Sequence, residues 1–217
     1  MELDYEAAHR GIVDYFRSRG LEWGGAAPGD RPAILVIDMA YGWTDATYPG
    51  GSLQMSRAVE WIARLLEGAR PLGVPVAYTT SPRPYGLWYD SSASEEEKAA
   101  LAQAHRSSRI DERIAPRAGD TVLYKSGSSA FFNTGLHRHL RSLQVDTLLI
   151  TGCVTSTCVR ASVVDASDNG FRNILVRECI ADRSESEHAW HIRDLTRWGK
   201  LLGVDDALAY LRKVAPG

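Results

Sequence analysis

Continuous apolar runs alternate along the chain with longer stretches in which apolar residues recur every three or four positions. The runs Ile34–Ile37 and Thr147–Ile150 are unbroken, which is typical of strands buried on both faces of a parallel sheet. Strands separated by helical stretches indicate βαβ units, which place helices on both sides of the sheet. The pattern predicts a doubly wound α/β fold with strands at Ala33–Asp38, Pro75–Thr80, Thr121–Lys125, Thr147–Thr151 and Asn173–Arg177.

Helical spacing is clearest in Ser52–Ala69, where the apolar residues share one side of a helix and Gly73 follows as a stop signal. In Ser91–His105, Ser94 stands ahead of three glutamates, a pattern typical of a helix N-terminus. We interpret the charges of that helix as a solvated face. The other predicted helices are Thr134–Leu143, Thr157–Asp168, Glu185–Arg197 and Asp205–Leu211.

The start of the chain forms a separate element. Tyr5–Arg19 has a helical pattern, and the Gly- and Pro-rich stretch Gly24–Pro32 separates it from the first strand. We expect residues 1–31 to form a helical arm that packs on the domain or on a neighbouring subunit. Residues 32–217 are expected to form one α/β domain, since no internal repeat or second boundary is visible.

Composition and charge narrow the class of protein. The 217 residues are 44% hydrophobic and carry 25 Lys and Arg against 27 Asp and Glu, a balance that argues against a nucleic-acid partner. The longest apolar run, Ala33–Ile37, is too short to cross a bilayer, and the acidic start of the chain is unlike a signal peptide. We therefore expect no membrane partner and a cytoplasmic location.

The cysteines and glycines bear on redox state and cofactors. Three cysteines, Cys153, Cys158 and Cys179, are too few for a disulfide framework and form no CxxC pair, so we interpret them as reduced thiols. No Gly-x-Gly-x-x-Gly follows the first predicted strand, which leaves a dinucleotide site without support.

Polar residues that close the apolar strands are the candidates for chemistry, because reactive groups of doubly wound sheets gather outside the carboxyl ends of the strands. Asp38, Lys125 and Cys158 occupy such positions. Each also has a structural interpretation: a turn cap for Asp38, a snorkelling side chain for Lys125 and an inert buried thiol for Cys158. A cysteine in the first turn of a helix and beside a lysine is expected to have its thiolate favoured.

Four blocks of sequence carry a resemblance to a known family. They are Pro32–Asp38, Lys125–Thr134, Thr151–Arg160 and the pair Asp182-Arg183 followed by His188. On these residues the chain resembles the isochorismatase-like cysteine hydrolases, most closely their N-carbamoylsarcosine amidase and maleamate amidase branch. One departure is Asn133, where the family commonly has glycine.

The resemblance implies a three-layer α/β/α domain with a mainly parallel sheet of about six strands. It implies a catalytic triad of Asp38, Lys125 and Cys158, in which the cysteine attacks an amide carbon and the aspartate relays the proton. The backbone N–H groups of Val154 and Cys158 would form the oxyanion hole, next to a cis peptide bond between Cys153 and Val154. It also implies a homo-oligomer, a dimer or tetramer, and no cofactor, because the chain supplies the nucleophile.

The same residues separate the branches of the family. True isochorismatases, which cleave a vinyl ether, lack the nucleophilic cysteine at the position of Cys158. Nicotinamidases bind a metal through an Asp-x-His-x-x-His stretch, and Thr79–Glu97 contains no histidine, so we expect no metal site.

Arg183 narrows the expected substrate. It matches the arginine with which the carbamoylsarcosine amidase branch grips a carboxylate, a role that suits a guanidinium. Its alternative role is an ion pair with Asp182, Glu185 or Glu187. Aromatic residues that either line the pocket or form an oligomer contact are Trp43, Tyr85, Trp88 and Tyr89, and Phe131 is a further candidate for substrate binding.

The sequence thus predicts an amidohydrolase that releases ammonia from a small amide or N-carbamoyl compound bearing a carboxylate. Two alternatives remain open. One is a hydrolase of the same fold acting on a cyclic ureide, a hydrazide or a vinyl ether; the other is a catalytically silent binding homologue.

Overall fold

A parallel sheet forms the centre of the protein. In the computed structural model, which describes residues 4–82 and 93–214, six strands pair in the order β3-β2-β1-β4-β5-β6, all of them parallel. The strands are β1 Pro32–Ile37, β2 Val76–Thr80, β3 Thr121–Tyr124, β4 Thr147–Cys153, β5 Arg172–Ala181 and β6 Gly199–Leu202. The α/β fold expected from the sequence is confirmed.

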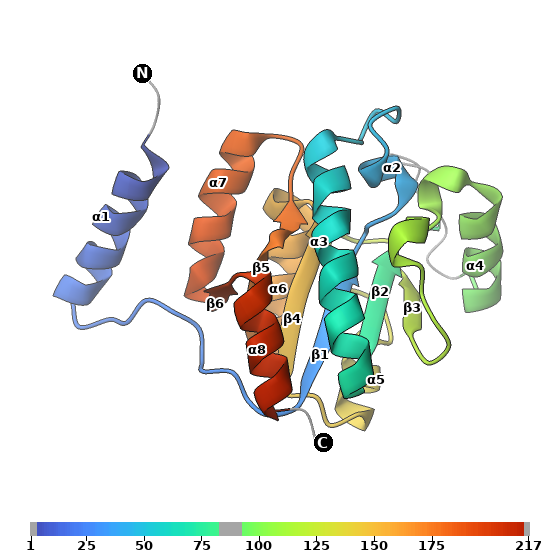
Figure 1. The fold of residues 1–217 in the computed structure, drawn as a ribbon. Helices are drawn as coiled ribbons and strands as arrows, with labels where there is room; N and C mark the ends of the chain where they lie inside the picture. The colour runs from blue at the N-terminus through green and yellow to red at the C-terminus, as the bar shows by residue number, and fades with distance from the viewer. Residues whose placement is uncertain (1–3, 83–92, 215–217) are drawn as a thin grey trace.

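Helices cover both faces of this sheet and make three layers (Figure 1). Along β1, Ile34 and Val36 pack on one face, whereas Ala33, Leu35 and Ile37 pack on the other, because successive side chains of a strand point to opposite sides. The first face is covered by α3 Leu53–Ala69 and α8 Val204–Val214, and the second by α5 Leu136–Ser142, α6 Arg160–Asp168 and α7 Glu185–Asp194.

The remaining helices lie at the rim. They are α1 Tyr5–Ser18, α2 Tyr41–Thr44 and α4 Glu95–Ala104, with 3₁₀ turns at Arg70–Leu72, Arg106–Ser108, Glu112–Ile114 and Leu195–Arg197. Figure 1 shows α1 outside α7, and the two helices are joined by an ion pair of 3.1 Å between Glu6 and Arg193.

Some local features differ from the sequence prediction. Strand β6 is not among the predicted strands, because Gly199–Leu202 is short, begins with glycine and shows no long apolar run. The predicted helix Glu185–Arg197 ends at Asp194 and continues as a 3₁₀ turn. The segment after β1 forms the single helical turn α2, which is not among the predicted helices.

Gly152 lets β4 pass close to β1. Its φ is +111°, and a Cβ at this position would collide with the carbonyl oxygen of Ile37. The pairing of β4 with β5 also shifts register between Ile150 and Gly152. Only glycine combines this φ with so close an approach of two backbones.

We therefore expect Gly152→Ala to lower the free energy of unfolding by about 3 kcal/mol or more, from the backbone collision together with the unfavourable φ. Gly73→Ala is the matched control, because Gly73 also has a positive φ, of +68°, but a Cβ there would meet no other atom within 4 Å; its cost should be about 1 kcal/mol. Urea unfolding of both variants measures the difference. Equal losses would contradict this role for Gly152.

Candidate active site

Three polar side chains meet at the carboxyl ends of the strands. Asp38 directly follows β1, Lys125 directly follows β3, and Cys158 lies in the turn Thr155–Val159 after β4. Because β2 lies between β3 and β1 in the sheet, the long lysine side chain crosses the end of β2 to reach Asp38. The structure thus brings together the three residues that the sequence singled out.

The ammonium group of Lys125 joins the other two side chains. Its Nζ lies 2.7 Å from Asp38 Oδ2, 3.4 Å from Cys158 Sγ and 2.9 Å from the carbonyl oxygen of Gly127. An ammonium has three hydrogens to donate, so these three partners account for all of them. Asp38 and Lys125 are buried, with 5% and 6% of their surface exposed, whereas Cys158 is partly exposed. The thiol is therefore the member of this cluster that a small molecule can reach most readily.

The backbone and a neighbouring strand fix the direction of the Asp38 carboxylate. Asp38 has a φ of +55°, in the left-handed region that aspartate tolerates better than most residues. Thr79, in β2, donates its hydroxyl hydrogen to Asp38 Oδ1 over 2.9 Å. One carboxylate oxygen therefore contacts Thr79, and the other faces Lys125.

The turn that carries Cys158 has an unusual backbone. The peptide bond between Cys153 and Val154 is cis. The carbonyl oxygen of Val154 then accepts hydrogen bonds from the N–H groups of both Thr157 and Val159, each at 3.1 Å, and Thr155–Val159 forms one π-helical turn before α6 begins. Cys158 thus lies in a π-helical turn, where the sequence predicted an ordinary first α-helical turn.

Burial decides the protonation state of the thiol. Burial and the Asp38 carboxylate raise the pKa of Cys158 to about 12, and the opposing effect of Lys125 is smaller. Burial acts to lower the pKa of Lys125, but Asp38 and Cys158 outweigh it and raise that pKa above its usual value. The expectation of a favoured thiolate is therefore wrong, because burial and Asp38 together outweigh the lysine. The resting group is a neutral thiol beside a carboxylate that can accept its proton.

Comparison with known proteins shows the family to which this chain belongs. The family model for the isochorismatase domain matches residues 32–206. The chain belongs to the isochorismatase family. Among its relatives are an N-carbamoylsarcosine amidase from Arthrobacter sp., 37% identical over 84% of this chain and 72% of that protein, and a maleamate amidohydrolase from Pseudomonas putida, 36% identical over 86% of this chain and 90% of that protein.

Solved structures support the fold of this isochorismatase-family chain. A cysteine hydrolase from Pseudomonas syringae superimposes with a TM-score of 0.73, is 20% identical and covers 88% of this chain and 98% of its own. An N-carbamoylsarcosine amidase from Thermoplasma acidophilum gives a TM-score of 0.66 at 24% identity, over 81% of this chain and 97% of its own. The resemblance to this family, and the three-layer fold that it implies, are confirmed.

Asn133 departs from the glycine that is common in the family, and its conformation explains the exchange. Its φ is +52°, which lies in the left-handed region. Glycine adopts this conformation freely, and asparagine tolerates it better than most other residues. The backbone of the Lys125–Thr134 block therefore accommodates asparagine at this position.

Arg183 lies where β5 ends, next to the buried Asp182. Its guanidinium carbon is 5.7 Å from the centre of the Trp43 ring, and its Nε is 4.0 Å from Asp182 Oδ1. Asp182 also accepts hydrogen bonds of 2.8 Å from the N–H groups of Ser156 and Arg183. One buried carboxylate thus holds both the Cys158 turn and the backbone of Arg183.

The other residues that were predicted to bind substrate lie either outside the described residues or against the core. Tyr85 and Trp88, together with Tyr89, lie outside the described residues. The ring of Phe131 packs into the core against Phe171, with 5.9 Å between ring centres. Phe171 directly precedes β5, so the ring of Phe131 contacts the core near the amino end of β5.

His188 supports the Cys158 turn from α7, a contact that the sequence did not reveal. Its Nδ1 lies 2.8 Å from the hydroxyl of Thr155. Burial lowers the pKa of His188, against an opposing effect of Asp182. A histidine with a lowered pKa is neutral in the folded protein and takes up a proton more readily on unfolding.

This linkage predicts a loss of stability in acid. The contribution of neutral His188 is complete above the ordinary histidine pKa of about 6.5 and decreases as the pH falls below it, because the unfolded state binds the proton first. Urea unfolding on both sides of that pH should show a smaller loss for His188→Gln than for the wild type. An identical pH dependence in the two proteins would contradict the assignment.

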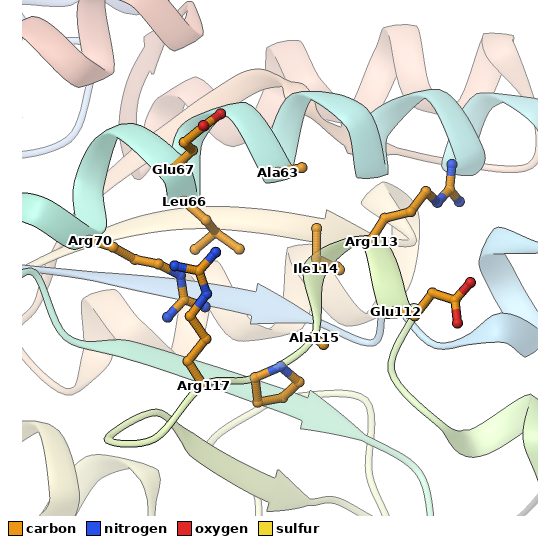
Figure 2. Close-up of a pocket in the computed structure, with 10 residues that line it drawn as sticks. Ala63, Leu66, Glu67, Arg70, Glu112, Arg113, Ile114, Ala115 and Arg117 are labelled. Carbon is orange, nitrogen blue, oxygen red and sulfur yellow. The ribbon is translucent and has the colours of Figure 1, made fainter.

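A separate hollow of about 330 Å³ lies beside the last two turns of α3 (Figure 2). The charged residues that line it are Glu67, Arg70, Glu112, Arg113 and Arg117. Arg70 pairs with Asp120, and Arg113 pairs with Asp111. Since α3 runs from the carboxyl ends of the strands back toward their amino ends, these turns lie away from the Asp38 cluster. Two of the arginines that line the hollow are thus already paired, and the hollow lies apart from the candidate active site.

The part of the chain that the structure describes contains neither a cluster of potential metal ligands nor a helix that could span a membrane. Within residues 4–82 and 93–214, no three His, Cys, Asp or Glu side chains gather in a way that could hold a metal ion. Within the same ranges, no helix has the length and apolar character needed to cross a membrane.

Proposed function

We propose that this isochorismatase-family hydrolase is an amidohydrolase that cleaves a C–N bond of a small carboxylate-bearing amide or N-carbamoyl compound and releases ammonia. The observation that carries the proposal is the contact of Lys125 with both Asp38 Oδ2 and Cys158 Sγ, at 2.7 and 3.4 Å. The names of two relatives, an N-carbamoylsarcosine amidase and a maleamate amidohydrolase, support this type of bond.

Cys158 is the proposed nucleophile and Asp38 the proposed base. Sγ attacks the amide carbon while its proton moves to the Asp38 carboxylate, so no free thiolate has to accumulate. The raised pKa of the thiol, about 12, is consistent with such a coupled transfer. Asp38 then donates the proton to the leaving nitrogen, the C–N bond breaks, and ammonia departs from a Cys158 thioester.

Water completes the cycle. Asp38 accepts a proton from the water as the water oxygen attacks the thioester carbon. As the C–S bond breaks, Asp38 returns this proton to Sγ, which regenerates the thiol and the carboxylate and releases the product acid. The N–H groups of Val154 and Cys158 are the proposed donors to the oxyanion in both steps. Lys125 holds the Asp38 carboxylate through its 2.7 Å contact and stabilises negative charge on Sγ, and it needs no proton transfer of its own.

Arg183 is the proposed ligand for the substrate carboxylate. A guanidinium can donate two parallel hydrogen bonds to a carboxylate. Arg183 lies beside Asp182, whose carboxylate also holds Ser156 in the Cys158 turn, so the proposed binding group and the nucleophile share one support. Trp43 lies under the guanidinium and limits its movement.

We further propose that the protein acts as a cytoplasmic homo-oligomer without a cofactor. Three free cysteines fit a reducing compartment. Helix α1 lies at the outer side of α7 (Figure 1), and Tyr15 remains 59% exposed on it, which leaves apolar surface for contact with a second subunit.

Ammonia release from a panel of amides tests the proposed function. The panel contains N-carbamoyl amino acids, maleamate, linear ureides, nicotinamide and neutral aliphatic amides, with Cys158→Ser as the control for contaminating amidases. We expect release from the members that bear a carboxylate and none from the variant. Silence of the folded protein across the panel, or equal release by the variant, would contradict the proposal.

A further inference from the structure

Ser162 bridges the two segments that carry Cys158 and Lys125. Its hydroxyl donates a hydrogen bond of 2.7 Å to the carbonyl oxygen of Cys158 and accepts one of 2.8 Å from the N–H of Ala130. Ser162 and Ala130 are both fully buried. One hydroxyl oxygen thus binds the backbone of the nucleophile on one side and the loop that follows Lys125 on the other.

The loop side of this bridge leads directly to the ammonium group. Gly127, three residues before Ala130, accepts a hydrogen bond of 2.9 Å from Lys125 Nζ. The distance from Nζ to Cys158 Sγ therefore depends on how this loop sits against the Cys158 turn. The Ser162 hydroxyl links the backbone of this loop, at Ala130, to the backbone of Cys158, next to the reacting atoms.

We propose that Ser162 is a positioning residue that sets the distance between Lys125 Nζ and Cys158 Sγ. Loss of its hydroxyl leaves the buried N–H of Ala130 without its acceptor, which is costly enough to shift the loop. A displacement of about 1 Å in a catalytic group can cost about 100-fold in rate. The rate prediction below rests on the proposed amidase function, whereas the labelling prediction does not.

Ser167 provides a matched control in the same helix, α6. Its hydroxyl donates to the carbonyl oxygen of Val163, also four residues earlier, at 3.1 Å and accepts from Asn173 Nδ2 at 2.9 Å. Ser167→Ala therefore also removes one hydrogen bond to a carbonyl oxygen four residues earlier and one accepted from an N–H group, here that of a side-chain amide, without touching the loop or the nucleophile. A purely structural role of Ser162 would make the two alanine variants behave alike.

The first measurement is kinetic, with the fastest amide of the panel. We expect Ser162→Ala to lower kcat about tenfold or more with little change in KM, because the substrate contacts remain. Ser167→Ala should stay within about twofold of wild type, and Ser162→Thr, which keeps the hydroxyl, should recover most of kcat. Equal kcat values for the two alanine variants, or no recovery in a Ser162→Thr protein that melts like wild type, would overturn the proposal.

The second measurement needs no turnover and so separates failure of this inference from failure of the proposed function. Iodoacetamide labels Cys158, and peptide mass spectrometry reads that site apart from the fully buried Cys153 and Cys179. Lys125 opposes the rise of the Cys158 pKa, so a longer Nζ–Sγ distance leaves less thiolate. Ser162→Ala should be labelled at least about threefold more slowly than Ser167→Ala near pH 8, and an equal or faster rate would overturn the proposal.

Discussion

Replacing Cys158 by serine is expected to leave the fold intact and to lower kcat at least about 10⁴-fold, as expected for loss of a catalytic nucleophile. A serine hydroxyl has nearly the volume of the thiol but is a far weaker acid, so the proton transfer to Asp38 no longer prepares a competent nucleophile. Ammonia release and circular dichroism of the purified variant measure activity and folding separately.

Cys179→Ala is the control for this experiment. Cys179 is fully buried in the core on the α3 side of the sheet, so its loss should reduce stability and leave kcat unchanged. Undiminished turnover in Cys158→Ser would remove the covalent mechanism and with it the assigned role of the Asp38 cluster.

The second large effect is expected from Arg183→Ala. If the guanidinium binds the substrate carboxylate, its removal should raise KM for acidic amides about 10- to 100-fold, the range expected for the loss of a hydrogen-bonded charge pair. Neutral amides should lose little, because they make no such contact. Steady-state kinetics on an acidic amide and its neutral counterpart measure the ratio.

Arg183→Lys separates charge from geometry in that comparison. Lysine keeps the positive charge but cannot donate two parallel hydrogen bonds, so its KM for the acidic amide should fall between those of wild type and Arg183→Ala. Equal effects of Arg183→Ala on acidic and neutral amides would assign Arg183 to the support of Asp182, whose Oδ1 lies 4.0 Å from Nε.

The sequence predicted those parts of the fold and site that depend on local pattern. Unbroken apolar runs located β1 and β4 because both are buried on their two faces. The polar residue that closes a strand marked Asp38 and Lys125, since parallel strands bring their carboxyl ends to one edge. Strand β6 was not predicted, because four residues that begin with glycine carry too little pattern.

Features that depend on contacts between distant segments could not be predicted. The protonation state of Cys158 depends on its burial and on Asp38, which a helix position and a neighbouring lysine do not reveal. The Ser162 bridge joins residues 32 positions apart, and Ser162 and Ser167 look alike in the sequence of α6. Their different surroundings appear only when the loop after β3 packs against that helix.

The thioester is the central claim, and competition between water and hydroxylamine tests it directly. Two substrates are compared that both carry the acyl group of the fastest amide of the panel. The leaving amine is ammonia in one and methylamine in the other, and both are hydrolysed in the presence of hydroxylamine. A common Cys158 thioester predicts one ratio of hydroxamate to acid for both substrates, whatever their rates. A ratio that changes with the leaving amine would contradict the thioester.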